Sequence, residues 1–568
     1  MKIQPSEFFF QPLKFSGTAS VCIYLLAMQH ANAQTPPTAT DVLRNIEQST
    51  QQIYPGRPKA VTKKSAPSND TEQYIARLNE IRVQSPLLQQ ELMSYWLAEI
   101  NKPVSAQKLG EFKAFAWELF QNKGYLAYVT THTQTTSNGT VLTVSVVLPK
   151  LNKVSIVTTE SDHGKEYVAE VAQRFNAIHK AGMPIDIQGI ENQLNAASYD
   201  LPVDLEVSMK QINATEVDLE IQLRYLHAQP GKLLGGVIQA NNFGLSQFGR
   251  NQILGNVRIA GFTSSSELTL TTQQSTSVSY YRADYEAPLV GAHSRLRVFA
   301  GNVKSSTAST EGLSNEIGIG LTTLLHTDRY GRWLAGSEMS RRETKNSSSD
   351  VVTSDRVDQQ VRLKIRAESS NGWVENFNNE FLFTVGRANL DRLESDKSDD
   401  AQGLRVAGEY QKVEIMGALS QTLDRDRIYT GSIRWKAQAT AKNLDSYNRM
   451  SLGGIGGIRA YSSLDGVGDQ GVQMSFDLIH QIVPDVYGGI FYDVGIIKTN
   501  HTPLITATDT HSYLLQGAGW QIGGKIQQFN WALSMAQSFG KIPGPSVWTA
   551  ANTRPGDFRV NFSVTRPF

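Results

Sequence analysis

Residues 361–368 read VRLKIRAE, and this alternation decides the fold. Apolar residues occupy the odd positions and charged residues the even ones. Successive side chains of a β-strand point to opposite faces, so this segment is predicted to be a strand with one apolar and one charged face. The same two-residue period returns at 281–287, 433–440 and 558–565. From about residue 233 onward, the sequence predicts strands and no helices.

Alternating segments of this kind recur along the whole C-terminal part of the chain. We expect about sixteen strands, an even number as bacterial membrane barrels require, beginning near residues 233, 251, 266, 278, 294, 315, 332, 358, 378, 408, 428, 472, 487, 514, 531 and 558. The strands of a soluble β-sandwich also alternate apolar and polar side chains, but they are shorter and their polar face meets bulk water. Repeated apolar faces with long polar connectors favour lipid outside and a wet, charged lumen. Residues 231–568 are therefore predicted to form a transmembrane antiparallel β-barrel.

The region before the barrel alternates strands with helices. Residues 72–150 and 151–230 each predict one β-α-α-β-β unit, which makes two small α+β modules. The expected elements are a strand at 75–83, helices at 87–100 and 105–122, a hairpin at 126–131 and 141–148, a strand at 151–157, helices at 165–180 and 185–197, and strands at 203–211 and 216–225.

The first 71 residues are predicted to contain a signal peptide for export, a polar helix and a linker. Residues 1–33 have a short apolar run and the small residues Ala31-Asn32-Ala33 before the expected cleavage point, as in a secretory signal peptide. The single cysteine, Cys22, lies inside that signal, so the mature chain would have no disulfide and no cysteine site. Residues 34–55 contain a mostly polar helix from Asp41 to Tyr54, and residues 56–71 are predicted to be a linker.

Several function classes are disfavoured by composition and motifs. The chain has 54 Lys and Arg against 53 Asp and Glu, so nothing points to a nucleic acid. No later stretch holds 18 consecutive apolar residues, so no transmembrane helix is expected. Neither of the phosphate-binding motifs, G-x-G-x-x-G before a helix and G-x-x-x-x-G-K-[ST], is present. The histidines do not have the spacing of metal ligands. No Ser/His/Asp set stands out, although spacing alone does not exclude one. We expect no catalytic residue, no metal and no cofactor.

The most informative motif is glycine-rich. Residues 451–461 read SLGGIGGIRAY, and residues 466–471 add three more glycines. Glycines permit a long loop to fold back on itself in a tight space. Within this loop, Gly457-Ile458-Arg459-Ala460-Tyr461 resembles the V-R-G-[FY] tip of the inward-folded loop of outer-membrane insertases and transporters that carry POTRA modules. Phe491-Tyr492-Asp493-Val494-Gly495 resembles the partner strand motif of that superfamily, F-x-D-x-G.

Two further segments narrow the resemblance. The run from Asn241 to Arg250 resembles the first hairpin of the two-partner secretion transporters, the TpsB group, and Gly124-Tyr125 resembles the end of their first POTRA module. The order of segments is also that of the group. The resemblance implies a bacterial outer-membrane location with the two modules in the periplasm. It implies export of an unfolded partner exoprotein, a haemolysin, adhesin or contact-dependent inhibition toxin, without ATP.

The resemblance also assigns roles to individual residues. Arg459 and Asp493 would form a pair in the lumen and hold the sixth outer loop, which follows the eleventh predicted strand. Taken singly, each residue is better explained as a solvated loop charge or a lumen carboxylate. The group has glycine where this chain has Ala460, so the loop tip is expected to differ in detail. The residues at 34–55 would plug the barrel at rest, and the modules would capture the passenger by strand addition.

The expected partners also include outer-membrane lipid or lipopolysaccharide, and the barrel assembly machinery, which would recognise the terminal Phe568. An insertase of the same superfamily that assembles other barrels is the nearest alternative, although such proteins usually carry more modules. A passive porin or an outer-membrane enzyme is a more distant one.

Overall fold

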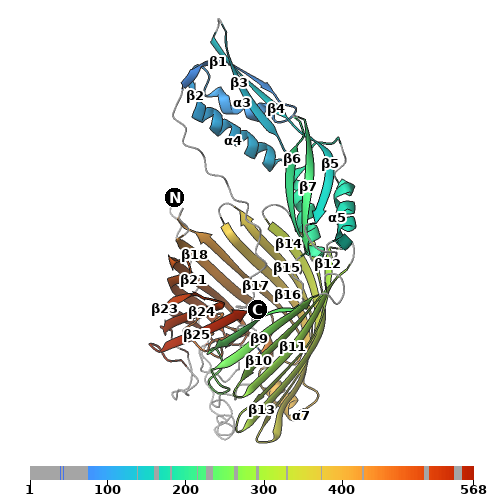
Figure 1. Ribbon diagram of the computed structural model, residues 1–568. Helices are drawn as coiled ribbons and strands as arrows, with labels where there is room; N and C mark the ends of the chain where they lie inside the picture. The colour runs from blue at the N-terminus through green and yellow to red at the C-terminus, as the bar shows by residue number, and fades with distance from the viewer. Residues whose placement is uncertain are drawn as a thin grey trace.

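The computed structural model of this 568-residue chain places two small modules above a large barrel (Figure 1). It describes residues 39, 43, 74–136, 139–158, 165–178, 182–201, 203–213, 215–225, 234–260, 266–289, 293–327, 331–371, 374–424, 428–503, 511–540, 542 and 553–568. The predicted signal peptide and linker lie outside these residues. So does the predicted helix at 41–54, apart from Leu43.

The barrel consists of sixteen antiparallel strands in one closed ring. In chain order they are β8 (Leu234–Asn241), β9 (Gln252–Ala260), β10 (Glu267–Ser275), β11 (Val278–Leu289), β12 (Ser294–Ser306), β13 (Thr310–Thr327), β14 (Gly331–Ser348), β15 (Val351–Asn371), β16 (Val374–Asn389), β17 (Gly408–Thr422), β18 (Tyr429–Thr440), β21 (Gln470–Val483), β22 (Val486–Lys498), β23 (Ser512–Ile526), β24 (Phe529–Ser538) and β25 (Phe558–Pro567). Each of the sixteen predicted strands is present. The ring closes where β25 pairs with β8.

The two faces of the barrel wall differ in chemistry. Outward side chains such as Ile317, Met339 and Ile490 are 60–62% exposed, whereas Arg342, Gln360 and Asp493 are buried on the inner side. An apolar exterior around a charged interior is the pattern of a barrel that faces lipid. Among the residues that the structure describes, no helix is long and apolar enough to cross a membrane.

In module 1, two helices pack on a four-stranded sheet. Its strands β1 (Tyr74–Gln84), β2 (Pro103–Ser105), β3 (Tyr128–Thr136) and β4 (Gly139–Val147) have the order β2-β1-β4-β3. The helices are α3 (Gln89–Leu97) and α4 (Ala106–Asn122), and their side chains Trp96, Phe112 and Phe120 are fully buried against the sheet. Ser105 caps α4 by accepting a 3.1 Å hydrogen bond from the amide of Lys108.

Module 2 has the same plan with a three-stranded sheet. Its strands β5 (Lys150–Thr158), β6 (Val203–Gln211) and β7 (Glu216–Tyr225) have the order β5-β7-β6, with α5 (Lys165–Ile178) and α6 (Ile187–Asp200) packed on them. The predicted fold class is confirmed: two α+β modules precede an antiparallel barrel of sixteen strands.

Module 2 touches one end of the barrel. The Tyr199 hydroxyl of α6 lies 3.4 Å from the carbonyl oxygen of Thr322, and Arg295 donates to the carbonyl oxygen of Tyr199 at 3.2 Å. Both barrel residues lie near the ends of their strands on the module side. We call this the proximal end and the opposite one the distal end (Figure 1).

One expectation is wrong in detail. Residues beyond 233 were expected to hold no helix, but α7 (Glu394–Gln402) forms between β16 and β17 at the distal end. Its sequence, ESDKSDDAQ, has no apolar face for periodicity to reveal. A tertiary contact ties it to the wall instead: Asp396 accepts two hydrogen bonds from Arg356 of β15, at 2.8 and 2.5 Å.

Candidate functional site

The glycine-rich segment lies in the loop between β18 and β21. Distal loops follow β8, β10, β12, β14 and β16, so this one, residues 441–469, is the sixth. A short hairpin of β19 (Met450–Ser451) and β20 (Val467–Gly468) forms within it. Its tip is deeply buried, with Ile458, Ala460 and Tyr461 at 0% exposure and Arg459 at 4%. We call this segment loop 6.

The structure brings Arg459 and Asp493 together. The Arg459 Nε donates to Oδ2 of Asp493 at 2.9 Å, and Nη2 donates to Oδ1 at 2.7 Å. The backbone amide of Arg459 adds a third hydrogen bond of 2.9 Å to the same carboxylate. A bidentate, charge-assisted contact of this kind fixes both distance and orientation. Asp493 lies on the inner face of β22, so the contact ties the tip of loop 6 to the wall.

Two residues that sequence reasoning did not single out as partners complete the surroundings of Arg459. Asp477 of β21 accepts from Nη1 of Arg459 at 2.6 Å, and it is itself held by Gln521 of β23 at 3.0 Å. The ring of Phe491 lies under the guanidinium, 3.5 Å from its Cζ. The cation thus has carboxylates at its edge and an aromatic face below it.

The glycines make room where chains approach closely. A Cβ at Gly457 would collide with the carbonyl oxygen of Leu452, and a Cβ at Gly495 would come within 2.9 Å of the Leu452 side chain. Ala460 does not adopt a positive φ. A Cβ on Gly517 of β23 would lie 2.7 Å from the Cβ of Ala460. The methyl group at 460, where the resembling group has glycine, therefore sits against a wall residue that has no side chain.

The base of loop 6 has a separate set of contacts with the wall. The ring of Tyr447 lies 3.0 Å from the guanidinium Cζ of Arg342 on β14. Asn448 donates to Asp358 of β15 at 3.4 Å, and the Tyr410 hydroxyl donates to the same carboxylate at 2.9 Å. Loop 6 is thus attached to β22 at its tip and to strands on another part of the wall at its base.

The base of loop 6 also contacts neighbouring distal loops. Asn443 donates to the carbonyl oxygens of Leu404, at 2.7 Å, and of Thr502, at 3.1 Å. Asp469, only 1% exposed, accepts from the amide of His501 at 2.8 Å and from Arg449 at 3.1 Å. Loops 5, 6 and 7 therefore meet at the distal mouth.

Two residues of the segment 34–55, which was predicted to plug the barrel, lie inside the barrel. Ala39 and Leu43 are helical and buried. They belong to an apolar cluster on the inner side of the wall, together with Leu245, Phe248, Val278, Tyr280 and Val303, against which Tyr447 and Leu464 of loop 6 pack. The amide of Ala39 also donates to Asn346 of β14 at 3.3 Å.

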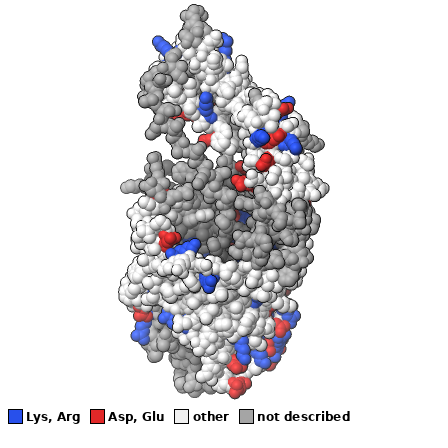
Figure 2. Space-filling view, viewed as in Figure 1, with Lys and Arg blue, Asp and Glu red and all other residues white. Residues whose placement is uncertain are grey.

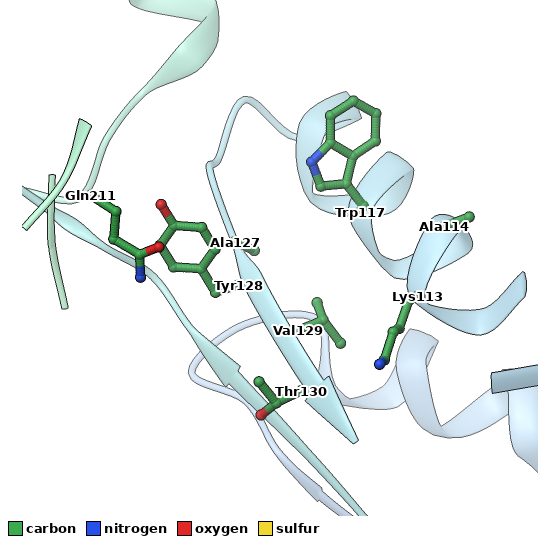
Figure 3. Close-up of a pocket in the computed structure, with 8 residues that line it drawn as sticks. All are labelled: Lys113, Ala114, Trp117, Ala127, Tyr128, Val129, Thr130 and Gln211. Carbon is green, nitrogen blue, oxygen red and sulfur yellow. The ribbon is translucent and has the colours of Figure 1, made fainter. Parts of the chain in front are cut away.

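Module 1 offers a groove beside an edge strand. β3 ends the sheet order, and α4 lies next to it. Side chains of α4 and β3 line the groove between them, with Gln211 of module 2 beside Tyr128 (Figure 3). The groove has a volume of about 550 Å³, and Trp117 at its border is 46% exposed. An edge strand next to an apolar helix face can accept a further extended segment.

The C-terminal residue lies at the closure of the barrel. The Phe568 amide donates to the carbonyl oxygen of Gly236 at 3.0 Å, and the Gly236 amide returns a 3.1 Å hydrogen bond. Gly236 has no side chain where the ring of Phe568 passes. Among the described residues, no group of three or more His, Cys, Asp or Glu side chains is placed to hold a metal ion.

Comparison with known proteins gives a likeness of fold. No protein-family model and no curated protein matches the chain. Among solved structures, CdiB from Escherichia coli and CdiB from Acinetobacter baumannii each superpose with a TM-score of 0.58 at 14% identity, covering 94% of this chain and all of theirs. BamA from Haemophilus ducreyi, lacking POTRA domains 1–3, superposes with a TM-score of 0.50 at 12% identity over 87% of this chain. At such identities the likeness shows a shared fold and nothing finer.

Proposed function

We propose that this chain is an outer-membrane transporter of the two-partner secretion type, which carries one unfolded exoprotein from the periplasm to the cell surface. The modules lie in the periplasm, and the barrel provides the path. The apolar outer face of the barrel and the chemistry of its lumen support the membrane location. The fold shared with the two CdiB structures is compatible with this role.

The observation that carries the proposal is the obstructed lumen. Loop 6 crosses it and is attached at tip and base, and Ala39 and Leu43 pack between loop 6 and the wall. A passive porin needs an open channel and gains nothing from such obstructions. A transporter that opens only for its passenger needs a closed resting state, because an open pore of this size would leak periplasmic solutes.

The structure of module 1 supports a role in recognising the passenger. Module 1 presents the edge of β3 next to the exposed ring of Trp117. An unfolded passenger could pair its backbone with β3 and place alternate side chains in the groove. Such capture is tolerant of sequence, and it needs no nucleotide.

The nearest alternative is an insertase for other barrels, because BamA from Haemophilus ducreyi shares the fold. The polar N-terminal segment with two residues packed inside the lumen favours transport. The proposal includes no enzymatic activity.

A deletion of residues 72–150 tests the proposal. We expect the barrel to insert in the membrane with normal heat-modifiable mobility, while the partner exoprotein no longer reaches the medium. Normal secretion by the deletion variant would overturn the recognition role of module 1. If depletion of the whole protein lowers the level of unrelated outer-membrane barrels, the insertase role is correct instead. A conductance trace of the intact protein with a permanently open channel would identify a porin.

A further inference from the structure

The lipid-facing side of the barrel carries a groove that export does not use. Its volume is about 1090 Å³, and it runs across strands between β10 and β17. About half of its lining consists of outward apolar side chains, among them Val298, Ile317, Ile319, Met339, Val361 and Val385. We call it the lipid groove.

Strand register places a sharp chemical boundary along this groove. Neighbouring strands form an outward apolar row of directly paired residues, Ile319, Met339, Val361 and Val385. The next outward row toward the distal end pairs Arg341 with Gln359 and Gln359 with Arg387. The apolar exterior of β14 and β16 therefore ends at an arginine. These two arginines are two strands apart, or roughly 10 Å at the usual strand spacing.

More basic residues lie just beyond this row. Lys345 lies four residues beyond Arg341 on β14, and Arg392 of loop 5 binds Glu343 at 3.0 Å. Figure 2 shows charged side chains of both signs gathered at this end of the barrel, over the strands labelled β11 and β13 in Figure 1.

The acidic neighbours leave two of the cations available. Glu343 binds both Arg341 and Arg392, and Asp355 lies 3.4 Å from Arg392. Lys345 and Arg387 are exposed, and neither forms an ion pair within the part of the chain that the structure describes. Asp355 opposes Lys345 across the strand pair, and Asp391 lies near Arg387, but neither carboxylate is ion-paired to these cations. Glu409 opposes Arg387 across the strand pair without forming an ion pair.

The boundary does not extend around the whole wall. In the sector from β22 to β25, exposed apolar residues continue close to the distal ends of the strands, as with Ile496, Leu514, Phe558 and Val560. Basic groups at an apolar boundary are therefore a local feature next to the lipid groove. They are not a ring around the whole barrel.

We propose that the lipid groove binds a phosphorylated glycolipid of the outer leaflet, lipopolysaccharide, with acyl chains against the apolar rows and separate phosphate groups at Lys345 and at Arg387. Arginine and lysine at the level of lipid headgroups attract phosphate, and an arginine can bind it through two nitrogens. The apolar rows of the groove run directly into the basic row, so one amphiphile can occupy both. This inference rests on the proposed outer-membrane location, because only the outer leaflet offers this lipid at the distal end.

The test uses the full-length protein purified in mild detergent. Lys345→Gln/Arg387→Gln removes both available cations, and Lys525→Gln/Arg566→Gln removes two exposed cations at the proximal end as a matched control. Native mass spectrometry measures bound rough-type lipopolysaccharide, and parallel titrations use dephosphorylated lipid A and phosphatidylglycerol. We expect the distal variant to bind lipopolysaccharide roughly tenfold more weakly than the parent protein, since each basic residue near an anionic lipid surface contributes measurably, and the control to bind as the parent does.

Each result decides the inference. Equal binding by the parent and the distal variant overturns it, and so does equal loss in the control. Equal affinity for dephosphorylated lipid A would show that phosphate does not contribute to binding. Equal affinity for phosphatidylglycerol would show that the groove does not prefer a glycolipid. Heat-modifiable mobility and membrane fractionation of the same variants show whether the barrel is folded and inserted. A failed lipid test with normal insertion and secretion therefore leaves the transporter proposal standing.

Discussion

Ala460 of loop 6 and Gly517 of β23 fit together as a methyl group against a missing side chain. A Cβ at position 517 would come within 2.7 Å of the Cβ of Ala460, closer than two carbon atoms can lie without displacement. The tip of loop 6 is therefore matched to a glycine on the barrel wall, far from it in sequence.

The first prediction concerns this contact between Ala460 and Gly517. Gly517→Ala should push the tip of loop 6 away from the wall, and Ala460→Gly should be tolerated, with a loss of about 1 kcal/mol for the buried methyl group. The double variant Ala460→Gly/Gly517→Ala should recover secretion toward the normal level, because the methyl group has only moved across the contact. Secretion and protease sensitivity of loop 6 in the four proteins provide the measurement. A double variant as defective as Gly517→Ala alone would show that the two positions do not depend on each other.

The second prediction concerns Arg459 and Asp493. Removing either partner strands a buried charge, which costs roughly 3–5 kcal/mol. Arg459→Ala and Asp493→Ala should each impair secretion strongly while the barrel still inserts. The double variant should be no worse than the worse single one, because both residues belong to one contact. Strictly additive losses in the double-mutant cycle would contradict a locking role for the pair.

The third prediction places the N-terminal segment in the resting pore. Ala39 and Leu43 pack against the inner wall and against loop 6. Deletion of residues 34–70 should therefore raise single-channel conductance markedly, because only loop 6 would then obstruct the water-filled lumen. Leu43→Asp, which puts a carboxylate into the apolar cluster, should shift conductance in the same direction by a smaller amount. Unchanged conductance in the deletion variant would mean that this segment does not obstruct the channel.

The fourth prediction concerns passenger capture by module 1. Trp117→Lys removes an exposed aromatic ring from the groove beside β3 and should reduce secretion severalfold at normal barrel levels. Leu97→Lys is the matched control, because Leu97 is 62% exposed on α3 of the same module and does not line that groove. Secreted exoprotein per inserted barrel is the quantity to compare. A similar loss in both variants would point to general damage to the module rather than to the groove.

The sequence alone determined the barrel and the modules that precede it. A two-residue period of apolar and charged side chains is a local property, so VRLKIRAE and its counterparts could be recognised as strands one at a time. The helices of the modules were equally accessible, because each carries its own apolar face, as with Phe112, Ala116 and Phe120 on α4. Helix α7 escaped prediction because it has no such face and is tied to the wall through Arg356.

Only the tertiary structure decided what surrounds the candidate site. The contact between Arg459 and Asp493 could be expected from two motifs, but its neighbours could not. Asp477 reaches loop 6 from β21 and is held by Gln521 of β23, and Gly517 of β23 lies against Ala460. The basic boundary of the lipid groove likewise depends on which residues of β14, β15 and β16 stand opposite one another. The physical reason is register: the period of a strand is written in its own residues, but its alignment with a neighbour is set by the closure of the whole ring.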